Sequence, residues 1–317
     1  MQYTHHEEGV VRALHAAPRR KLDVWQLTRK VGYLLDTIKA VERLRRVGVV
    51  TAGNSIVVLA DAKGVPAYVL KKEKPLLDVV RVYVRLRHRA RFANVAFDQL
   101  MIEPSAIHNK LALMQKRGDL LNKDILCIGD DDLFSVACAL TGLPRSVTAL
   151  DADESVLAYI RSISPRLPIP VQTIHHNLIN PIPKRYYESF DVFVTEPPET
   201  IKATLLFVMQ GLRVLRKRGA FHLGMTEVTL GSRDHHAVEK ALLEAGAVIT
   251  DILHDCEEYA VEGNELTSVW GTALPAWVSK LPRSPWFVST LFRGEVVTKK
   301  RLKLPSRVTK KDLSTEV

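Results

Sequence analysis

The stretch CIGDDDLFSVACAL, residues 127–140, joins the end of an apolar strand pattern to the beginning of an apolar helix pattern. A glycine, Gly129, stands at the junction, and Gly142 closes the helix pattern. A strand, a tight turn and a helix in this order predict the first unit of a nucleotide-binding α/β fold. Three consecutive aspartates, Asp130, Asp131 and Asp132, occupy the turn where such folds usually carry small residues. This stretch therefore bears both on the fold and on the charge of the ligand that the fold binds.

The segments around this stretch alternate between strand and helix patterns. Strands are expected at 125–129, 146–151, 171–178, 190–198 and 220–226, and helices at 103–124 (ending near Gly118), 133–142, 154–163 and 200–219. The segment after about residue 245 supplies closing strands. The strand patterns are almost continuously apolar, as in parallel sheets that helices cover on both faces. The sequence therefore predicts a doubly wound Rossmann sheet.

The N-terminal part predicts a small helical domain. Three helix patterns at 7–16, 22–31 and 34–50 precede a hairpin pattern at 49–61 with a Gly-Asn turn. This order is typical of a winged helix. The third helix pattern carries Lys39, Arg43, Arg45 and Arg46, which could contact DNA phosphates. Such domains also serve as dimerisation or lid modules with solvated basic faces, and DNA binding is not the favoured interpretation.

Charge separates three predicted parts of the chain. Residues 1–90, the winged-helix-like domain with its connector, hold 18 Lys and Arg against 8 Asp and Glu. Residues 91–298, the Rossmann-like domain, hold 20 against 25, and residues 299–317 form a basic tail that is expected to be flexible. An acidic middle in a protein of net charge +10 permits a cationic small ligand there.

Composition removes several classes of protein. The sequence contains no apolar run of membrane-spanning length and no apolar segment near its start, so a cytoplasmic protein is expected. Cys127, Cys138 and Cys256 lack the spacing of a zinc site, and neither the His175-His176 pair nor the His235-His236 pair lies in a metal-binding motif. No metal and no disulfide framework are predicted.

Carboxylates follow three of the predicted strands. Asp151 lies 22 positions after Gly129, close to the spacing of about 20 for a carboxylate that binds ribose hydroxyls. The missing GxGxxG motif and the aspartates argue against a dinucleotide, because they would repel a pyrophosphate. A methyltransferase-like fold instead binds an adenosyl compound, with ribose at the second strand end and adenine near the third. Gly129, Asp130, Asp151 and Ala152 are the predicted nucleoside contacts at the first two ends.

The aspartate turn indicates which adenosyl compound is bound. Placing the carboxylate of S-adenosylmethionine against Asp130, Asp131 and Asp132 in a low-dielectric cleft would cost several kcal/mol. The decarboxylated compound presents only a sulfonium and an ammonium, which carboxylates stabilise, and a polyamine acceptor would be attracted for the same reason. The alternative is that the aspartates only cap the following helix.

Two further acidic segments follow. TEPPET, residues 195–200, ends a strand with an acid-Pro-Pro turn, as in methyltransferases that methylate amino groups of nucleic acids, although no aromatic residue follows the prolines. Pro-Pro could also simply end the strand. The segment DCEEYAVEGNE contains Asp255, Glu257, Glu258 and Glu262, and is either a solvated acidic loop or a lid over a cationic substrate.

Together these segments resemble one family, the branched-chain polyamine synthases, or N4-bis(aminopropyl)spermidine synthases, of thermophilic archaea and bacteria. The string GDDDLFSVACALTGLP, with FDVFVTEPPET and VITDILHDCEEY, carries the resemblance over residues 95 to 295. It implies transfer of aminopropyl groups from decarboxylated S-adenosylmethionine, as co-substrate and without another cofactor, to the secondary amine of spermidine or a similar polyamine. The products would be branched polyamines and methylthioadenosine.

The resemblance also implies roles for individual residues. Asp132, the last aspartate of the GDDD motif, is the expected catalytic residue, and the polyamine would contact Asp131, Asp132, Glu196, Glu199 and Glu258. Two positions depart from the family pattern. Glu196 stands where the family has aspartate, and Asn177-Leu178, the expected adenine contacts, stand where it has Asp-Leu. Both changes bear on the choice of acceptor and on activity.

Two alternatives remain open on the sequence alone. One is a nucleic-acid amino-methyltransferase that uses S-adenosylmethionine, and the other is a polyamine-sensing DNA-binding regulator with a degenerate enzyme domain. A homodimer is also expected, formed through the N-terminal domain or the aromatic segment PAWVSKLPRSPWF.

Overall fold

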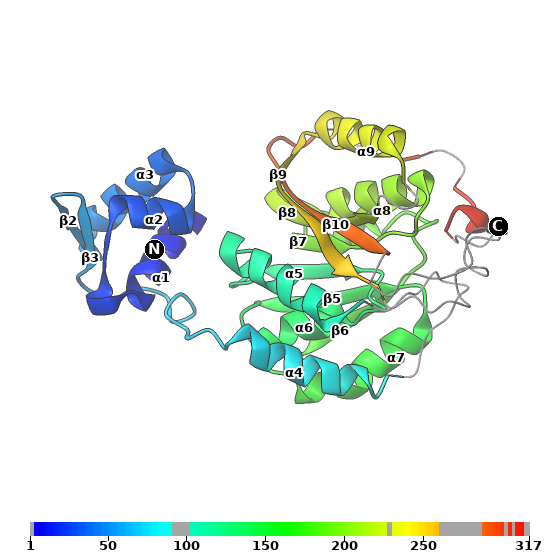
Figure 1. Cartoon of the computed structure of the whole chain (residues 1–317), viewed down its shortest axis with the longest axis horizontal. Coiled ribbons are helices and arrows are strands. Elements are labelled where there is room, and N and C mark those ends of the chain that lie inside the picture. The colour runs from blue at the N-terminus through cyan, green and yellow to red at the C-terminus, as the bar shows by residue number, and fades with distance from the viewer. Residues whose placement is uncertain are drawn as a thin grey trace, which may run out of the picture. The chain divides into compact units, whose positions relative to one another are not determined.

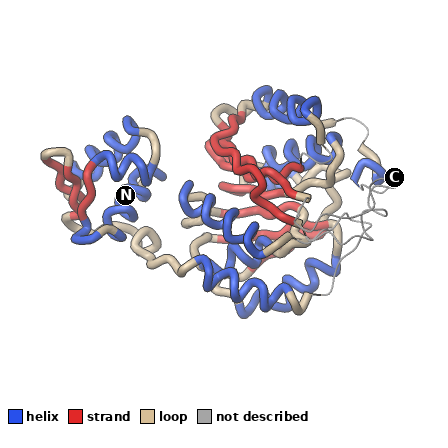
Figure 2. The backbone as a smooth tube through the Cα atoms, viewed as in Figure 1, coloured by secondary structure: helices blue, strands red, loops and turns tan. Residues whose placement is uncertain are grey.

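The computed structural model describes residues 3–90, 102–226, 230–259, 287–300, 304–305 and 308–313 (Figures 1 and 2). The chain forms two compact units, Met1–Glu73 with Leu113–Leu121, and Lys74–Ala112 with Asn122–Val317. Helix α4, Leu76–Arg87, which lies in the predicted connector, belongs to the larger unit. Within the described residues, no helix is both long and apolar enough to cross a membrane.

The smaller unit contains the three helices and the hairpin that the sequence predicts. Its elements are α1 His5–Ala16, η1 Pro18–Arg20, β1 Lys21–Asp23, α2 Val24–Val31, α3 Leu34–Arg46, β2 Val50–Gly53 and β3 Ile56–Leu59. The strands form an antiparallel sheet in the order β1-β3-β2. The sequence reading missed β1, because three residues are too short for a strand pattern to show. The designation as a winged helix stays a prediction.

The basic residues of α3 have acidic partners within the smaller unit. The distance from Arg43 Nε to Glu7 Oε1 is 3.0 Å. Lys39 and Arg45 lie 3.9 Å and 3.5 Å from acidic side chains of their own helix. Three of the four side chains offered to DNA phosphates are thus engaged in ion pairs, which are mostly exposed and weak. DNA binding stays a prediction.

The larger unit is built on a seven-stranded sheet. Its strands are β4 Asp124–Ile128, β5 Ser146–Asp151, β6 Val171–His175, β7 Phe190–Thr195, β8 Leu215–Thr226, β9 Ala247–Glu258 and β10 Val288–Val296. The order is β6-β5-β4-β7-β8-β10-β9. The pairs from β6 to β8 are parallel, and β10 runs antiparallel to both of its neighbours. The predicted doubly wound α/β sheet is confirmed.

Helices cover both faces of this sheet (Figure 1). Helices α4, α6 and α7 lie on one face and α8 and α9 on the other. Besides α4, the helices are α5 Pro104–Arg117, α6 Phe134–Thr141, α7 Glu154–Ile163, α8 Ile201–Val214 and α9 Ser232–Glu244, and short 3-10 turns are η3 Ser164–Arg166, η4 Lys184–Tyr186 and η5 Lys310–Leu313. Helix α9 is not among the helices expected from the sequence.

The end of α8 differs from the prediction. The sequence predicts a helix to residue 219, whereas α8 ends at Val214 and β8 begins at Leu215. Leu215 pairs with Phe190 of β7, and Arg216 Nη1 lies 2.8 Å from Asp124 and 2.9 Å from Asp191. Pairing with the sheet thus overrides the helix propensity of this basic segment, because propensity is only a weak preference.

The chain reverses its direction across the sheet between β4 and β7. It runs outward from β4 to β5 and β6, then returns to β7 on the other side of β4. The Thr195 hydroxyl at the end of β7 donates to the Ile128 carbonyl oxygen at the end of β4, at 2.9 Å. The acidic turns after these two strands therefore start side by side, at the position where doubly wound sheets bind ligands.

The described part of the C-terminal tail contacts the larger unit. Leu304, Val308 and Leu313 pack against its hydrophobic core. The Thr200 hydroxyl donates to the Asp312 carbonyl oxygen at 2.6 Å, and Lys202 Nζ lies 3.0 Å from the Asp312 carboxylate. Asp312 of the tail thus contacts the start of α8, and the flexibility expected of the tail stays a prediction.

Gly211 is a position where the packing of α8 on β7 can be tested. A Cβ atom there would lie 2.6 Å from the buried ring of Phe193. Although alanine favours a helix interior by about 1 kcal/mol over glycine, we expect Gly211→Ala to lower the free energy of unfolding by about 1–3 kcal/mol, because the ring must move. The measurement is urea unfolding followed by circular dichroism.

The matched control is Gly231→Ala, because a Cβ atom there meets no atom of the described residues within 4 Å and Gly231 has a φ of −77°. This variant should unfold close to the wild-type midpoint. An equal or higher midpoint for Gly211→Ala would contradict the packing described above.

Candidate active site

The turn after β4 depends on Gly129. Its φ is +66°, a backbone conformation that glycine adopts without strain. The Gly129 amide donates to the Leu150 carbonyl oxygen at 2.9 Å, and the Asp130 amide donates to Asp151 Oδ2 at 2.8 Å. The first aspartate turn is thus joined to the acidic end of β5.

Asp130 points into the protein and holds the start of α6. Its carboxylate accepts hydrogen bonds from the Ser135 amide, at 2.9 Å, and from the Ser135 hydroxyl. Burial raises the pKa of Asp130 to about 7, against the effect of these bonds, and Asp151 and Asp132 raise it further. The Asp130 side chain thus caps the start of α6, as in the alternative interpretation of the aspartates.

Asp132 is buried and held by three groups. Arg87 Nη2 of α4 donates to Asp132 Oδ1 at 3.1 Å, and the Ile102 amide donates to the same oxygen at 3.2 Å. The Tyr83 hydroxyl donates to the Asp132 carbonyl oxygen at 2.5 Å. Burial, together with the nearby Glu196, raises the pKa of Asp132 to about 7, while Arg87 opposes the rise. Asp132 can therefore gain or lose a proton near neutral pH.

Asp131 is half-buried and adjoins Asp130 and Asp132 along the turn. Its pKa is raised well above the usual range, first by burial and then by the charges of Asp132, Asp151 and Glu196. Glu196 follows β7, the strand that pairs with β4, so its charge acts on both Asp131 and Asp132. The structure thus brings together the two acidic turns that the sequence singles out.

The predicted nucleoside contacts lie along the neighbouring strand ends. Asp151 accepts from two backbone amides, those of Asp130 at 2.8 Å and Asp153 at 2.7 Å, which fix its carboxylate. Burial raises the pKa of Asp151. The Ala152 carbonyl oxygen lies 3.1 Å from His175 Nε2.

The third strand end carries the predicted adenine contacts. The side-chain oxygen of Asn177 accepts from the Ile179 amide at 3.0 Å, so a bond from this oxygen to an adenine would have to use its second lone pair. Leu178 is buried, and its carbonyl oxygen accepts from Gln210 Nε2 at 3.2 Å. The predicted roles of all these residues in binding stay predictions.

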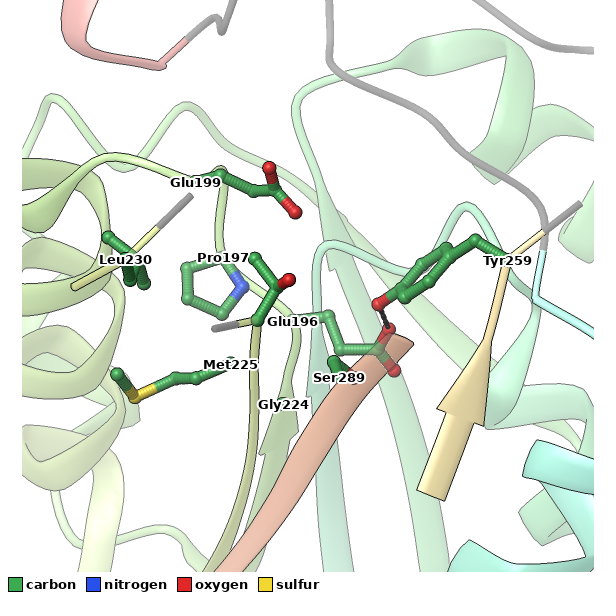
Figure 3. A pocket seen from close by; sticks show the side chains of 9 residues that line it. Glu196, Pro197, Glu199, Gly224, Met225, Leu230, Tyr259 and Ser289 are labelled. Atoms are coloured by element: carbon green, nitrogen blue, oxygen red, sulfur yellow. Dashed lines mark hydrogen bonds between the residues drawn. The ribbon is translucent and has the colours of Figure 1, made fainter. Parts of the chain in front are cut away.

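Glu196 lies in a buried network with a lysine. Lys110 Nζ of α5 contacts Glu196 Oε1 and lies 2.8 Å from Glu257 Oε1 of β9. The Tyr259 hydroxyl donates to Glu196 Oε2 at 2.7 Å, and the Ser289 hydroxyl of β10 donates to Glu257 Oε2. Figure 3 shows the hydrogen bond between Tyr259 and Glu196 on one side of Glu196, with Pro197 and Met225 on the other side.

Protons are distributed unequally between the two glutamates. Burial opposes ionisation of Glu196, but the charge and hydrogen bond of Lys110 outweigh it and lower the pKa of Glu196. Burial and the charge of Glu196 raise the pKa of Glu257 to about 7. Glu196 therefore stays ionised near neutral pH, whereas the charge of Glu257 depends on pH in this range.

Gly224 of β8 makes room for this pair. A Cβ atom there would lie 2.5 Å from Glu257 Oε2 and 2.6 Å from Glu196 Cγ. Both glutamates thus pack against the backbone of Gly224, in space that the Cβ atom of any other residue would occupy.

A pocket opens beside Glu196 (Figure 3). Its lining comes from the turn after β7 (Glu196, Pro197 and Glu199), from residues 224–226 of β8, and from Leu230, Tyr259 and Ser289. Glu199, a predicted polyamine contact, thus shares the pocket with Glu196. Glu258, another one, follows Glu257 along β9, and successive side chains of a strand point to opposite faces. The structure places Glu257, and not Glu258, beside Glu196, and the role of Glu258 stays a prediction.

Part of the acidic segment DCEEYAVEGNE lies outside the described residues, including Glu262, as do residues 275–286 of the aromatic segment. Within the described part of that acidic segment, Glu257 is buried in a strand and is neither a solvated loop nor a lid residue.

Several residues of the site carry no motif in the sequence. They are Tyr83, Arg87, Lys110 and Tyr259, with Glu257 visible only as one member of an acidic cluster. One sequence pattern could have identified Lys110 as buried. It shares a helix face with Ile107, Leu111 and Met114, which are all buried. A lysine on the apolar face of a helix indicates a buried charge partner. Among the described residues, no cluster of three or more His, Cys, Asp or Glu could hold a metal.

The family model for the C-terminal domain of branched-chain polyamine synthase A matches residues 76–316. The chain belongs to this family. The resemblance noted in the sequence is thereby confirmed. The match begins at α4, so the helix that supplies Arg87 lies inside the family domain.

Individual relatives agree with this result. The N(4)-bis(aminopropyl)spermidine synthase of Methanocaldococcus jannaschii is 31% identical over 269 residues, which are 84% of this chain and 74% of the relative. The crystal structure of the branched-chain polyamine synthase from Thermus thermophilus, in complex with N4-aminopropylspermidine and 5′-methylthioadenosine, matches with a TM-score of 0.68 and 26% identity, covering 99% of this chain and 93% of that chain. A putative RNA methyltransferase from Pyrococcus horikoshii matches with a TM-score of 0.53 at 13% identity over 70% of this chain and 98% of that chain, which shows a methyltransferase-like fold.

The raised pKa values lead to a prediction about ligand binding. A bound polycation stabilises ionised carboxylates, so it lowers the pKa of groups that titrate near 7, such as Asp132 and Glu257. Binding of spermidine at pH 7 should therefore release protons. The measurement is isothermal titration calorimetry in phosphate and in Tris, two buffers with different ionisation enthalpies. Equal binding enthalpies in both buffers would contradict the clustered, partly protonated carboxylates.

Proposed function

We propose that the protein transfers aminopropyl groups from decarboxylated S-adenosylmethionine to the secondary amine of spermidine or a similar polyamine. The products are a branched polyamine and methylthioadenosine. The observation that carries the proposal is that the turns after β4 and β7 start side by side at the switch point of the sheet, where the charge of Glu196 acts on Asp131 and Asp132. Family membership and the compounds bound to the Thermus relative support it.

The charge of the site favours a donor without a carboxylate. Burial raises the pKa of both Asp131 and Asp132, and the charge of Glu196 raises both further, so another carboxylate nearby would raise the electrostatic free energy. A sulfonium and an ammonium would lower it. This preference also distinguishes the proposal from a methyltransferase, whose donor is the intact S-adenosylmethionine.

The acceptor amine must lose its proton before it can act as a nucleophile. Asp132 accepts that proton, and its pKa of about 7 makes it a stronger base than an ordinary aspartate. The amine nitrogen then forms a bond to the aminopropyl carbon attached to sulfur. The carbon–sulfur bond breaks, and its electron pair stays on sulfur, which becomes the neutral thioether of methylthioadenosine.

Positioning of the acceptor falls to the other carboxylates. Asp131 lies next to the base, and Glu199 lines the pocket beside Glu196. Ammonium groups of the polyamine bound at these carboxylates would hold the reacting amine beside the donor carbon, and such positioning supplies much of a rate enhancement. We also propose that the active protein is a homodimer.

Replacement of Asp132 tests the role of the proposed base. We expect Asp132→Asn to lower kcat by about 100-fold or more, because general-base catalysis contributes about 10²–10⁴-fold. The measurement is formation of methylthioadenosine from decarboxylated S-adenosylmethionine and spermidine, together with chromatography of the polyamine products.

The matched control is Asp78→Asn, an exposed aspartate of α4 in the same unit, which should keep wild-type activity. If Asp132→Asn also kept full activity, Asp132 would not be the base. If the wild type formed neither product at any temperature, the proposed function itself would be wrong.

Arg87 offers a test through pH. Its charge opposes the rise in the pKa of Asp132, so Arg87→Gln should raise that pKa further. Because the reaction requires ionised Asp132, the acid limb of the pH profile of kcat/KM should move to higher pH. The control is Arg81→Gln, an exposed arginine of the same helix that pairs with Asp78. An acid limb that stayed in place or moved to lower pH would contradict the role of Arg87.

A further inference from the structure

Lys110 is a buried charge that the proposed reaction does not use. Its side chain is only 2% exposed, although lysine is among the residues that are rarely buried. Its ammonium lies between Glu196 and Glu257, 2.8 Å from Glu257 Oε1 and in contact with Glu196 Oε1. The ring of Phe134, from α6, lies 4.7 Å from Nζ. The site thus contains a primary ammonium that comes from the protein itself.

This ammonium stays charged. Burial favours neutral Lys110, but the charges of Glu196 and Glu257 outweigh burial and raise the pKa of Lys110 well above its usual value. A lysine ammonium and the terminal ammonium of a polyamine are the same chemical group at the end of an alkyl chain. Lys110 therefore makes with Glu196 the contact that an acceptor ammonium would otherwise make.

Glu196 consequently lines the pocket while its negative charge is paired with the Lys110 ammonium. Oε1 contacts Lys110, and Oε2 accepts from Tyr259 at 2.7 Å. Glu199 lines the same pocket. The Lys110 ammonium thus occupies, at Glu196, one of the two glutamates of this pocket at which the sequence predicts a contact with the acceptor.

We propose that Lys110 is a specificity-determining residue that limits the number of ammonium groups an acceptor can place in this pocket. The Lys110 ammonium takes the place at Glu196 that an ammonium of the acceptor would otherwise take. The site therefore favours an acceptor with one amine fewer than it would bind if Lys110 were absent. This proposal rests on the proposed function and adds to it the reason for a choice among polyamines. In this proposal Lys110 is a positioning residue that acts through Glu196.

The test compares a triamine with a tetraamine. For the wild type and for Lys110→Met, which keeps an unbranched side chain and removes the ammonium, kcat/KM is measured with spermidine and with spermine. The variant should shift the ratio of the two values towards spermine by about tenfold or more, the size expected for one charged hydrogen bond. The shift should appear mainly in KM, because Lys110 affects binding of the acceptor and not the proton transfer.

A second variant covers the case in which the first does not fold. Lys110→Met leaves two buried carboxylates together, whereas Lys110→Met with Glu257→Gln removes one cation and one carboxylate charge. The double variant should show the same shift towards spermine, and Glu257→Gln alone should not. The matched control is Lys116→Met, an exposed lysine of the same helix, which should keep the wild-type ratio.

The outcomes separate the two proposals. An unchanged ratio in a folded Lys110→Met or in the double variant, with an active wild type, would overturn the role of Lys110 and leave aminopropyl transfer intact. If the wild type transfers no aminopropyl group, the proposed function fails, and the ratio of spermine to spermidine affinities by calorimetry still tests Lys110. A shift towards spermine in the variants and not in Lys116→Met supports it in either assay.

Discussion

Repulsion between buried carboxylates is the interaction on which the rest of this site depends. The strand ends of β4, β5 and β7 place Asp130, Asp131, Asp132, Asp151 and Glu196 within reach of one another, with Glu257 added from β9. Their charges cannot all persist in a buried space, so several titrate near neutral pH. Two cations offset part of the charge, Arg87 at Asp132 and Lys110 at Glu196. The remaining negative charge is the part that a cationic ligand can neutralise.

The fold keeps these like charges close by fixing them to different elements. Asp130 and Asp151 are held by backbone amides and by Ser135, which makes them parts of the turn. Asp132 is held by α4 and by the Ile102 amide, and Glu196 by α5 and Tyr259. Bare backbone at Gly224 leaves space for two glutamates. The same seven-stranded sheet thus serves as a rigid support for a constellation that would not hold together in a flexible loop.

The sequence predicts the sheet and the acidic strand ends because both are local patterns. Apolar strands, the GDDD turn and the spacing to Asp151 can be recognised within short segments, and the structure confirms the doubly wound sheet. The residues that neutralise the site lie far away along the chain, since Lys110 and Glu196 are 86 positions apart. No local pattern shows such a contact. The end of α8 was missed for a similar reason, because pairing with β7 decides it.

We infer that the carboxylates of the site exclude a donor that carries a carboxylate of its own. The most direct measurement is the affinity of the protein for decarboxylated S-adenosylmethionine and for S-adenosylmethionine, by calorimetry at pH 8, where the acidic groups are largely ionised. Like charges brought together at a binding site cost several kcal/mol, so the decarboxylated compound should bind about 100-fold more tightly or better. Equal affinity, or tighter binding of S-adenosylmethionine, would contradict the account.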